Sequence, residues 1–449
     1  MKQLLGIALV LGLAAPALGS EKGFLEICEL AEEVPGIAAT VNSLKKMAVG
    51  FKRKTLTCQE LYAEVKDKTD LQLPGHTFHY YDVRDVSLLA QLEKVTTLNL
   101  RHQKLEYLQP LANLTGLRSL DITGVKTDIA VLRDLKLTEL KMTPSTSLPM
   151  DILSFLPLES LELQAVEPGS HLGMLPYSLR RLKIEGREIS DLSAVSRISL
   201  SDLQLFGAPV RDFSFLKNSI TTLRTLRVFG AEGVDPKELG RLQQIRNLEM
   251  IACKLTSTDF VKNLRTLETV NLGQNELNET FGFASLVNLR KLDLQHNSIS
   301  DARALLDLFK LEELNLSSNR FYNFDMGYLE RLKKLDLSDN QLALLNLHAV
   351  DDAEYRLESL MLSNNRLSDV RAGLKPFKRL KELGLTSNKL MTTTGLETLT
   401  TLEVLMIGDN KLTDISALSA LTRLKALEIY DNPLPKPIVC PITPATACF

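Results

Sequence analysis

The chain has 449 residues, of which 44% are hydrophobic, and 53 basic and 55 acidic residues give it a formal net charge of -2. This near balance provides no field that would attract nucleic acid or an anionic membrane, so we expect neither as a partner. The length would ordinarily suggest two or three domains, yet no shift in composition marks a boundary between them. Internal repeats are therefore the first organisation to consider.

The N-terminal residues 1–19 have the pattern of a signal peptide. Lys2 precedes an apolar run from Leu4 to Leu18, and Ala17-Leu18-Gly19 places small residues where a signal peptidase needs them, so we expect cleavage after Gly19. A membrane anchor is the alternative, but about fifteen apolar residues fall short of the roughly twenty that span a bilayer. We therefore expect export to a periplasm or to the extracellular space, without membrane insertion.

Residues 20–72 contain no repeat and are predicted to form a helical N-terminal cap of two or three short helices. Thr57 and Glu60 have the T-x-x-E spacing of a capping box, which opens the last of these helices. Such a segment would cover the exposed apolar edge of the first strand that follows.

From Leu73 to Leu434 the pattern L-x-x-L-x-L-x-x-N-x-L recurs in about 17 units, as in LRKLDLQHNSI from Leu289. The two apolar residues of each L-x-L core point to one side of a short strand. One unit cannot cover that apolar side, so units stack, with each strand parallel to the next. The connectors need more room than strands spaced about 4.8 Å apart. The pattern therefore predicts a curved parallel sheet with the strands on its concave side.

The ninth position of the later units is predicted to form a structural ladder, because a buried amide there can bond backbone groups left unpaired at the turn. Cys253 occupies this position in its own unit, and we interpret it as a free, buried structural thiol. The earlier units place other residues there, Gln103 among them, so we expect the ladder to be missing in that half. The asparagines are Asn275, Asn297, Asn319, Asn340, Asn365, Asn388, Asn410 and Asn432.

On these motifs the chain resembles the leucine-rich-repeat family, specifically its 22-residue class. Residues 191–195 and 414–418 look like the convex segments of bacterial internalins and of the phosphatase-regulatory type of repeat. The resemblance implies an α/β leucine-rich-repeat solenoid over residues 73–434, with short 3₁₀, extended or helical connectors on the convex face. Internalins continue into an immunoglobulin-like module and surface-anchoring sequences, which are not found here, so we do not expect cell-wall attachment.

Four cysteines flank the repeats. Cys28 and Cys58 precede them, whereas Cys440 and Cys448 lie in the Pro-rich residues 435–449, which are predicted to be a closing cap. An exported protein permits disulfides, and a rigid solenoid would hold its two ends far apart. We therefore predict the pairs Cys28–Cys58 and Cys440–Cys448, with reduced thiols remaining possible.

The side chains that alternate outward from the sheet are the candidates for partner binding. Phe206, Phe229 and Ile251 occupy the seventh positions of successive units, and the neighbouring eighth positions are too small to shield them. An apolar centre with a polar rim is typical of an interaction surface. Packing of the three against one another, or cover by a loop, is the alternative. The rim residues are Gln204, Arg224, Arg227, Arg246 and Glu249.

Two smaller groups and one ladder of charges complete the candidates. Met361, Met406 and Tyr430 form a second, weaker patch, which Gly384 should interrupt. The group His79, Tyr80, Arg101 and His102 lacks a carboxylate or Cys to complete a metal site, so surface residues are favoured and no metal or cofactor is expected. Charges at the second and third positions, such as Glu312, Glu313, Lys333 and Lys334, change sign between units and predict exposed ladders of ion pairs.

The favoured function is that of a secreted, monomeric, non-enzymatic module that binds a protein on the concave face. A structural or adhesive protein of the cell envelope or surface is the alternative. An enzyme is disfavoured, because the six histidines are scattered and the sequence has no H-E-x-x-H, G-x-S-x-G or phosphate-binding glycine motif.

Overall fold

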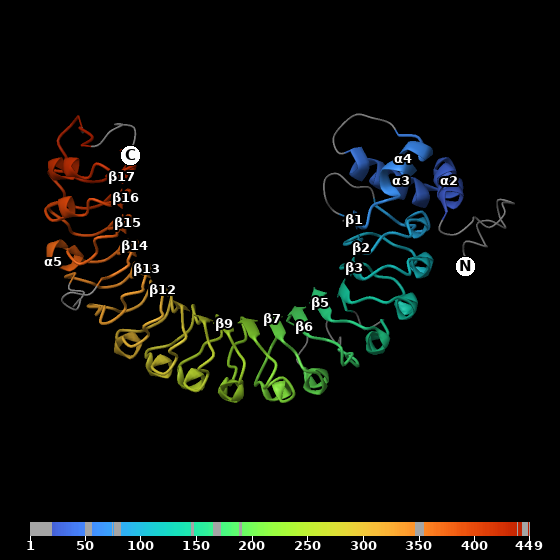
Figure 1. Cartoon of the computed structure of the whole chain (residues 1–449), viewed down its shortest axis with the longest axis horizontal. Coiled ribbons are helices and arrows are strands. Elements are labelled where there is room, and N and C mark those ends of the chain that lie inside the picture. Colours follow the sequence, from blue (N-terminus) through green and yellow to red (C-terminus); the bar gives the residue numbers. More distant parts are fainter. Residues whose placement is uncertain are drawn as a thin grey trace. The chain divides into compact units, whose positions relative to one another are not determined.

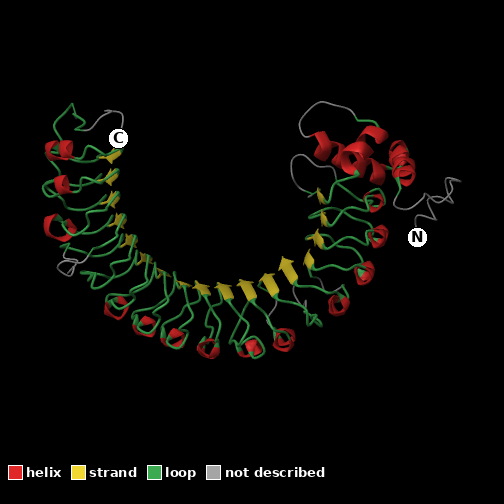
Figure 2. Ribbon diagram, in the orientation of Figure 1, coloured by secondary structure: helices red, strands yellow, loops and turns green. Residues whose placement is uncertain are grey.

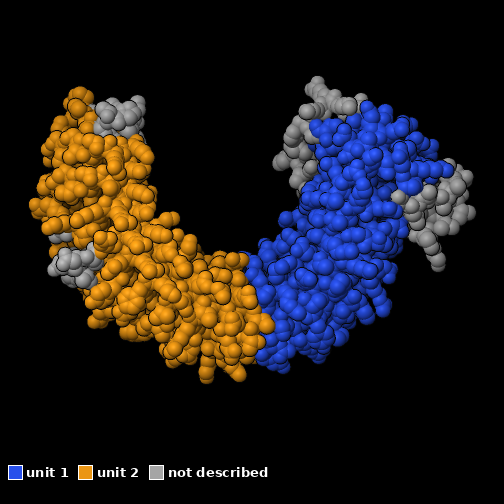
Figure 3. Space-filling view, in the orientation of Figure 1, with its two compact units in different colours: residues 1–209, 215–219 blue, residues 210–214, 220–449 orange. Residues whose placement is uncertain are grey.

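The structure is a computed structural model that describes residues 20–49, 56–73, 75, 82–144, 148–164, 172–187, 191–345, 354–437, 439–441 and 448. The predicted signal peptide lies outside these residues. The chain divides into two compact units, residues 1–209 with 215–219 and residues 210–214 with 220–449 (Figure 3). In each unit short strands line the inner side and short helices the outer side (Figure 2). This arrangement confirms the predicted leucine-rich-repeat fold.

Helices precede the strands of the first unit, as the sequence predicts (Figure 1). The side chain of Thr57 accepts the backbone N–H of Glu60 at 3.2 Å, and the Glu60 carboxylate accepts the backbone N–H of Thr57 at 2.9 Å, so the predicted capping box is present. A Cys28–Cys58 disulfide joins the first of these helices to the last, which confirms that pair. The elements are α2 (Glu21–Glu29), η1 (Leu30–Glu32), α3 (Pro35–Val49) and α4 (Cys58–Val65).

The first unit contains parallel strands that pair in chain order from β1 to β7. Their L-x-L side chains, such as Leu98 and Leu120, are buried, because every second residue of a strand faces the same side. The strands are β1 (Asp70–Gln72), β2 (Thr97–Asn99), β3 (Ser119–Ile122), β4 (Glu139–Met142), β5 (Ser160–Gln164), β6 (Arg181–Glu185) and β7 (Asp202–Phe206). The 3₁₀ connectors are η2 (Leu89–Gln91), η3 (Gln109–Asn113), η4 (Ala130–Asp134), η5 (Met150–Phe155) and η6 (Ser193–Arg197).

The register that we predicted for the first repeat, with Leu73 opening the unit, is wrong. Leu71 pairs with Leu98, and the backbone N–H of Leu73 bonds to the carbonyl of Asn99, so Leu73 takes the place that Leu100 has in the next repeat. Both Leu71 and Leu73 are fully buried. They therefore form the L-x-L core of this repeat, and its strand lies earlier in the chain than the pattern suggested.

The second unit continues the same design with parallel strands that pair in order from β8 to β17. They are β8 (Thr225–Phe229), β9 (Asn247–Ile251), β10 (Thr269–Asn271), β11 (Lys291–Asp293), β12 (Glu313–Asn315), β13 (Lys334–Asp336), β14 (Ser359–Met361), β15 (Glu382–Gly384), β16 (Val404–Met406) and β17 (Ala426–Glu428). The remaining connectors of the chain are η7 (Ser214–Leu216), η8 (Lys237–Arg241), η9 (Asp259–Val261), η10 (Phe281–Phe283), η11 (Arg303–Leu305), α5 (Arg371–Leu374), η12 (Leu396–Thr398) and η13 (Ser416–Ala420). The predicted short connectors are thus confirmed.

The asparagine ladder of the second unit is also confirmed. The Nδ2 of Asn275 donates to the carbonyls of Met250, Leu272 and Gly273, and its Oδ1 accepts the backbone N–H groups of Cys253 and Leu255. One buried amide thus satisfies backbone groups of two successive repeats, which would otherwise be buried without partners.

Gln103 and Cys253 also occupy ninth positions, where Gln103 bonds to the backbone as the asparagines do and Cys253 is accommodated as a buried thiol. Gln103 accepts the N–H of Val83 and donates to the carbonyl of Leu73, both at 2.7 Å, so the ladder is not missing throughout the first unit as we expected. Cys253 is fully buried with a free thiol, as predicted, and its burial raises the pKa of that thiol. The thiol contacts the carbonyl of Ile251 at 3.4 Å.

The C-terminal segment returns to the last strand of the second unit. Cys448 forms a parallel bridge with Leu427 of β17, and its disulfide to Cys440 confirms the second predicted pair. This contact gives a backbone partner to the outer edge of β17, which would otherwise be open to pairing with another chain.

Candidate partner-binding surface

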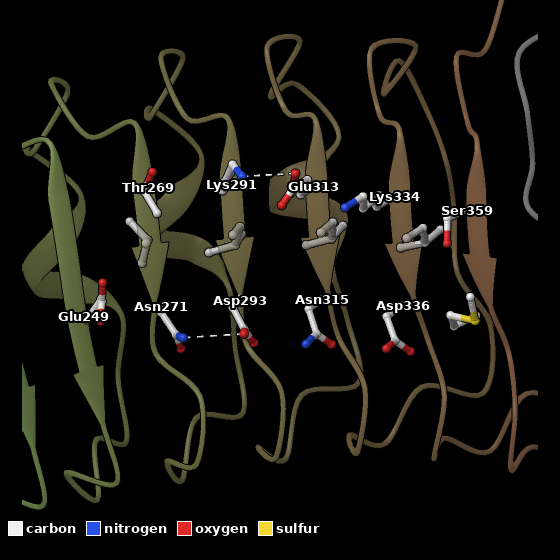
Figure 4. A pocket seen from close by; sticks show the side chains of 15 residues that line it. Glu249, Thr269, Asn271, Lys291, Asp293, Glu313, Asn315, Lys334, Asp336 and Ser359 are labelled. Atoms are coloured by element: carbon white, nitrogen blue, oxygen red, sulfur yellow. Dashed lines mark hydrogen bonds and ion pairs between the residues drawn. The ribbon is translucent and has the colours of Figure 1, made fainter. Parts of the chain in front are cut away.

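The inner face of the second unit has a groove of about 460 Å³ across β9 to β14. Figure 4 shows that its polar walls are two rows of side chains, one from the third and one from the fifth position of each repeat. The first row is Thr269, Lys291, Glu313, Lys334 and Ser359. The second row is Glu249, Asn271, Asp293, Asn315, Asp336 and, at its end, Met361.

Backbone geometry explains why Asp and Asn recur in the second row. Oδ1 of Asp293 accepts the backbone N–H of Gln295 at 3.0 Å, and Oδ1 of Asp336 accepts that of Ser338 at 2.9 Å. Asn271 and Asn315 make the same bond two residues onward. An Asp or Asn at the end of these strands therefore satisfies an N–H that the sheet leaves unpaired. The second carboxylate oxygen of Asp293 accepts a long hydrogen bond of 3.5 Å from the side chain of Asn271.

The electrostatics of the row centre on Asp293, which is half-buried. Burial raises the pKa of its carboxyl group, and the negative charge of Asp336 raises it further. Hydrogen bonds from Gln295 and Asn315 lower the pKa but do not outweigh the burial. Across the groove the ammonium group of Lys291 is held by Glu313 at 3.1 Å. Asp293 is thus a partly desolvated carboxylate with no ion pair in the part of the chain that the structure describes.

The predicted ladder of ion pairs runs along the second positions. Glu312 is held by Arg290 at 2.9 Å on one side and by Lys333 at 2.7 Å on the other. Arg246 and Glu268 form an equivalent pair at 2.7 Å. Such exposed pairs contribute little to stability individually, so this row is a solvated border of the sheet.

The methionines of the predicted second patch meet over a glycine. A Cβ at Gly384 would lie 2.7 Å from Sδ of Met361 and 3.6 Å from Cε of Met406. Both methionine side chains therefore lie across the Gly384 backbone, and this glycine joins the group that we expected it to interrupt. The ring of Tyr430, which is 46% exposed, covers Gly408 in the same way, with its Cε1 2.7 Å from the position of a Cβ there.

Two of the three apolar residues of the predicted central patch belong to the second unit. Phe229 and Ile251 pair directly across β8 and β9, and both are half-buried rather than fully exposed. Beside them the guanidinium of Arg227 contacts the carboxylate of Glu249 at 2.9 Å. Gly230 has a φ of +67°, a conformation that favours glycine, so the small residue beside Phe229 also serves the backbone turn.

The other two rim residues of the second unit, Arg224 and Arg246, are exposed, and the Arg246 side chain pairs with Glu268. The third apolar residue, Phe206, belongs to the first unit together with Gln204. Phe206 is half-buried, and the ammonium group of Lys183 lies 5.4 Å from the centre of its ring. Gln204 donates to Asp202 at 2.9 Å.

Sequence reasoning missed a charge network on the inner face of the first unit. Glu162 accepts from Lys183 at 2.6 Å and lies 3.2 Å from the ammonium group of Lys141. Burial alone would raise the pKa of Glu162, but hydrogen bonds from Lys183, Gln164 and Lys141 outweigh it and lower the pKa to about 2. The signal was present, since these three charges alternate in sign at the fifth positions of successive repeats.

The predicted N-terminal group is described only in part. Arg101 donates to the ring of His102 at 3.1 Å, whereas His79 and Tyr80 lie outside the described residues. Among the described residues no group of three or more His, Cys, Asp and Glu side chains is placed to hold a metal ion. In the same part of the chain no helix is both long and apolar enough to cross a membrane.

Comparison with known proteins agrees with this architecture. A family profile described as Leucine Rich repeat matches residues 285–302. The chain is 32% identical to osteomodulin from Bos taurus over 132 residues, which are 28% of this chain and 31% of that protein. It is 26% identical to lumican from Bos taurus over 258 residues, 55% of this chain and 67% of lumican. The chain thus spans between about a third and two thirds of these relatives.

Two solved structures extend the comparison. The ectodomain of the receptor kinase GASSHO1/SCHENGEN3 from Arabidopsis thaliana, solved in complex with CASPARIAN STRIP INTEGRITY FACTOR 2, matches with a TM-score of 0.53 and 20% identity, covering 78% of this chain and 49% of that one. An internalin from Listeria monocytogenes matches at 19% identity and a TM-score of 0.38 over 94% of each chain. From its repeats, its parallel strands with an asparagine ladder, and its sequence similarity to osteomodulin and lumican, we conclude that the chain has the leucine-rich-repeat fold.

Proposed function

We propose that this chain is an exported, non-enzymatic module that binds a protein partner on the inner face of its repeats. The observation that carries the proposal is the pair Phe229 and Ile251, which lie partly exposed side by side on the sheet next to the Arg227–Glu249 ion pair. Large apolar side chains beside a fixed charge pair are the usual anchors of a protein interface. In the first unit, Phe206 with Lys183 offers a second contact of the same kind.

Two further observations support the proposal. The Cys28–Cys58 and Cys440–Cys448 disulfides fit an oxidising compartment outside the cytosol, in keeping with the signal-like residues 1–19. The GASSHO1/SCHENGEN3 ectodomain, which shares the fold, was solved with its factor bound.

The test is affinity capture from extracellular or envelope extracts with the wild type and a Phe206→Ser, Phe229→Ser, Ile251→Ser variant. A matched control carries Phe155→Ser, Tyr177→Ser and Phe281→Ser, three residues that are at least 59% exposed and lie in the connectors. We expect a captured partner to bind the purified control as well as the wild type and the inner-face variant at least tenfold more weakly. Equal binding by all three proteins, each shown to be folded, would refute the proposed surface.

A structural or adhesive role remains the second candidate, and one feature of the second unit favours it. Val287, Phe309 and Tyr328 are between 50% and 54% exposed in successive repeats, and the rings of Phe309 and Tyr328 are 6.5 Å apart. Exposed apolar side chains that gather in this way promote association. Light scattering distinguishes the two candidates, since self-association that Phe309→Ser abolishes would support the structural role over our expectation of a monomer.

A further inference from the structure

The inner face of β14 to β17 in the second unit carries an apolar platform, and Glu428, which pairs with Met406 across the strands and accepts from Thr386 at 2.9 Å, lies beside it. We define it as Met361, Met406 and Tyr430 with the two glycines that they cover, Gly384 and Gly408. Any larger residue at either glycine would displace the side chain above it, because a Cβ would come within 2.7 Å of Met361 Sδ or of the Tyr430 ring. Methionine side chains adapt readily to the shape of a bound apolar group. The platform is thus suited to receive an apolar side chain of a ligand.

The platform continues directly into the polar groove. Met361 belongs to both, because it is also the last residue of the row that begins at Glu249. Four carboxylates and two lysines line this groove. Lys291 is already paired with Glu313, and Glu249 with Arg227. Among the described residues Asp293, Asp336 and Lys334 have no ion pair, and each aspartate uses one oxygen on the backbone. The other oxygen of Asp293 accepts a 3.5 Å hydrogen bond from Asn271. Two carboxylates thus stand against one ammonium group, and this excess of negative charge favours a cationic ligand.

The partial burial of Asp293 strengthens this preference. Desolvation raises the pKa of its carboxyl group, which means that the charged form lacks part of its hydration. An incoming ammonium or guanidinium group would supply the missing interaction through a charge-assisted hydrogen bond. An anionic ligand, such as a nucleic acid backbone, would instead meet repulsion from both aspartates.

The dimensions favour an extended chain as the occupant. Five strand spacings separate β11, which carries Asp293, from β16, which carries Met406, and this corresponds to roughly 24 Å at about 4.8 Å per spacing. An extended polypeptide rises about 3.3 Å per residue, so about seven residues cover the distance. The seventh positions beside this path are mostly small, and at Gly408 the ring of Tyr430 lies over the backbone. The others are Gln295, Ser317, Ser338, Ser363 and Thr386.

We infer that this part of the sheet binds an extended segment of a partner protein whose basic side chains pair with Asp293 and Asp336 and whose apolar side chain rests on the platform. The inference deepens the proposed function and rests on it. It names the chemistry of the partner, a segment that combines lysine or arginine with an apolar anchor about three to five residues away.

The test uses the purified full chain and three fluorescein-labelled decapeptides in serine–glycine spacers. One contains two lysines followed by leucine and phenylalanine, the second has glutamate in place of lysine, and the third has serine in place of the apolar pair. We expect the first peptide to bind at least tenfold more tightly than either of the others by fluorescence anisotropy. Binding of the glutamate peptide at equal affinity would overturn the inference.

Substitution of the two aspartates tests whether they cause the preference for the lysine peptide. Asp293→Asn with Asp336→Asn keeps the oxygen that accepts the backbone N–H, as Asn271 and Asn315 show. We expect this pair of changes to weaken the lysine peptide about tenfold. The matched control is Asp121→Asn in the first unit, which has the same backbone bond to Thr123 and should leave the affinity unchanged.

The apolar contact has its own variant and control. Met361→Ser should weaken the lysine peptide severalfold and leave the peptide without apolar residues unaffected, whereas Met391→Ser, at a residue that is 68% exposed in a connector, should change neither. Unchanged affinity in the aspartate or methionine variants would overturn the inference. Capture of a partner through Phe229 and Ile251 without any preference among the peptides would also overturn it, and would leave the proposed function standing. Failure of both capture and peptide binding would overturn both.

Discussion

The side-chain oxygen of Asn275 accepts the backbone N–H of Cys253 at 3.0 Å, so that one buried amide links two successive repeats. The same amide also bonds to Leu255 and to three carbonyls. Because each of these backbone groups is buried, loss of the amide leaves several of them without a partner. The stability of the second unit therefore depends on this row as well as on its leucines.

Asn275→Ala should destabilise the second unit by about 2 to 4 kcal/mol, because several buried polar groups lose their partner at once. Urea unfolding followed by circular dichroism measures the loss. Asn288→Ala is the matched control, because its side chain bonds to Arg265 and Lys310 at the surface. A difference between the two variants of less than about 0.5 kcal/mol would contradict the role of the ladder.

The thiol of Cys253 should not react with a thiol reagent while the chain is folded. The side chain is fully buried and its pKa is raised by that burial, so little reactive thiolate is present or accessible. Titration with a chromogenic disulfide reagent should show no reaction in buffer and one thiol in denaturant. Rapid reaction of the native protein would disprove the structural assignment.

Glu162 should stabilise the first unit at neutral pH and stop doing so in acid. Its folded pKa of about 2 lies below the value of 4.5 for a free glutamate, so its contribution is complete above about pH 4.5 and is lost as the pH falls towards 2. We expect Glu162→Gln to be about 1 to 2 kcal/mol less stable at pH 7, after allowance for solvent screening. Urea unfolding at several pH values checks this, and a difference that persists undiminished near pH 2 would exclude the mechanism.

Asp293→Asn should change the stability at pH 7 in the direction opposite to that of Glu162→Gln. Burial raises the folded pKa of Asp293, so the protonated form is favoured in the fold and stability is lost as the pH rises through that pKa. Asn keeps the bond to Gln295 and carries no charge, so the variant should be equal or more stable at pH 7 by less than about 1 kcal/mol. Thermal unfolding at pH 7 and near pH 3 measures the difference, which should shrink in acid. A clear loss of stability at pH 7 would show that the charge is needed.

Removal of the Cys28–Cys58 disulfide by a double change to serine should destabilise the helical segment by about 3 to 4 kcal/mol, because the bond closes a loop with a sequence separation of 30. Limited proteolysis should then cut between α2 and α4. The corresponding change at Cys440 and Cys448, with a separation of 8, should cost less, about 2 to 3 kcal/mol. Equal resistance to protease with and without Cys28–Cys58 would contradict the expectation for that bond.

The sequence by itself determined the repeating architecture of this protein. Leucines at alternating positions dictate which side of each short strand is buried. A polar amide at the ninth position hydrogen-bonds the backbone groups that the turn of each repeat would otherwise leave buried without partners. These are local demands, so the pattern revealed the strands, the connectors, the asparagine row and the place of Cys253 without reference to any distant residue.

Only the tertiary structure decided which outward side chains act together. Met361 and Met406 meet over Gly384, and Lys141 and Lys183 meet at Glu162, although at least 20 residues lie between neighbouring members of each group in the chain. The true register of Leu71 against Leu98 was likewise set by pairing between strands. Such contacts depend on how stacked strands align and on the rotamers that packing selects, and a pattern within one repeat carries neither kind of information.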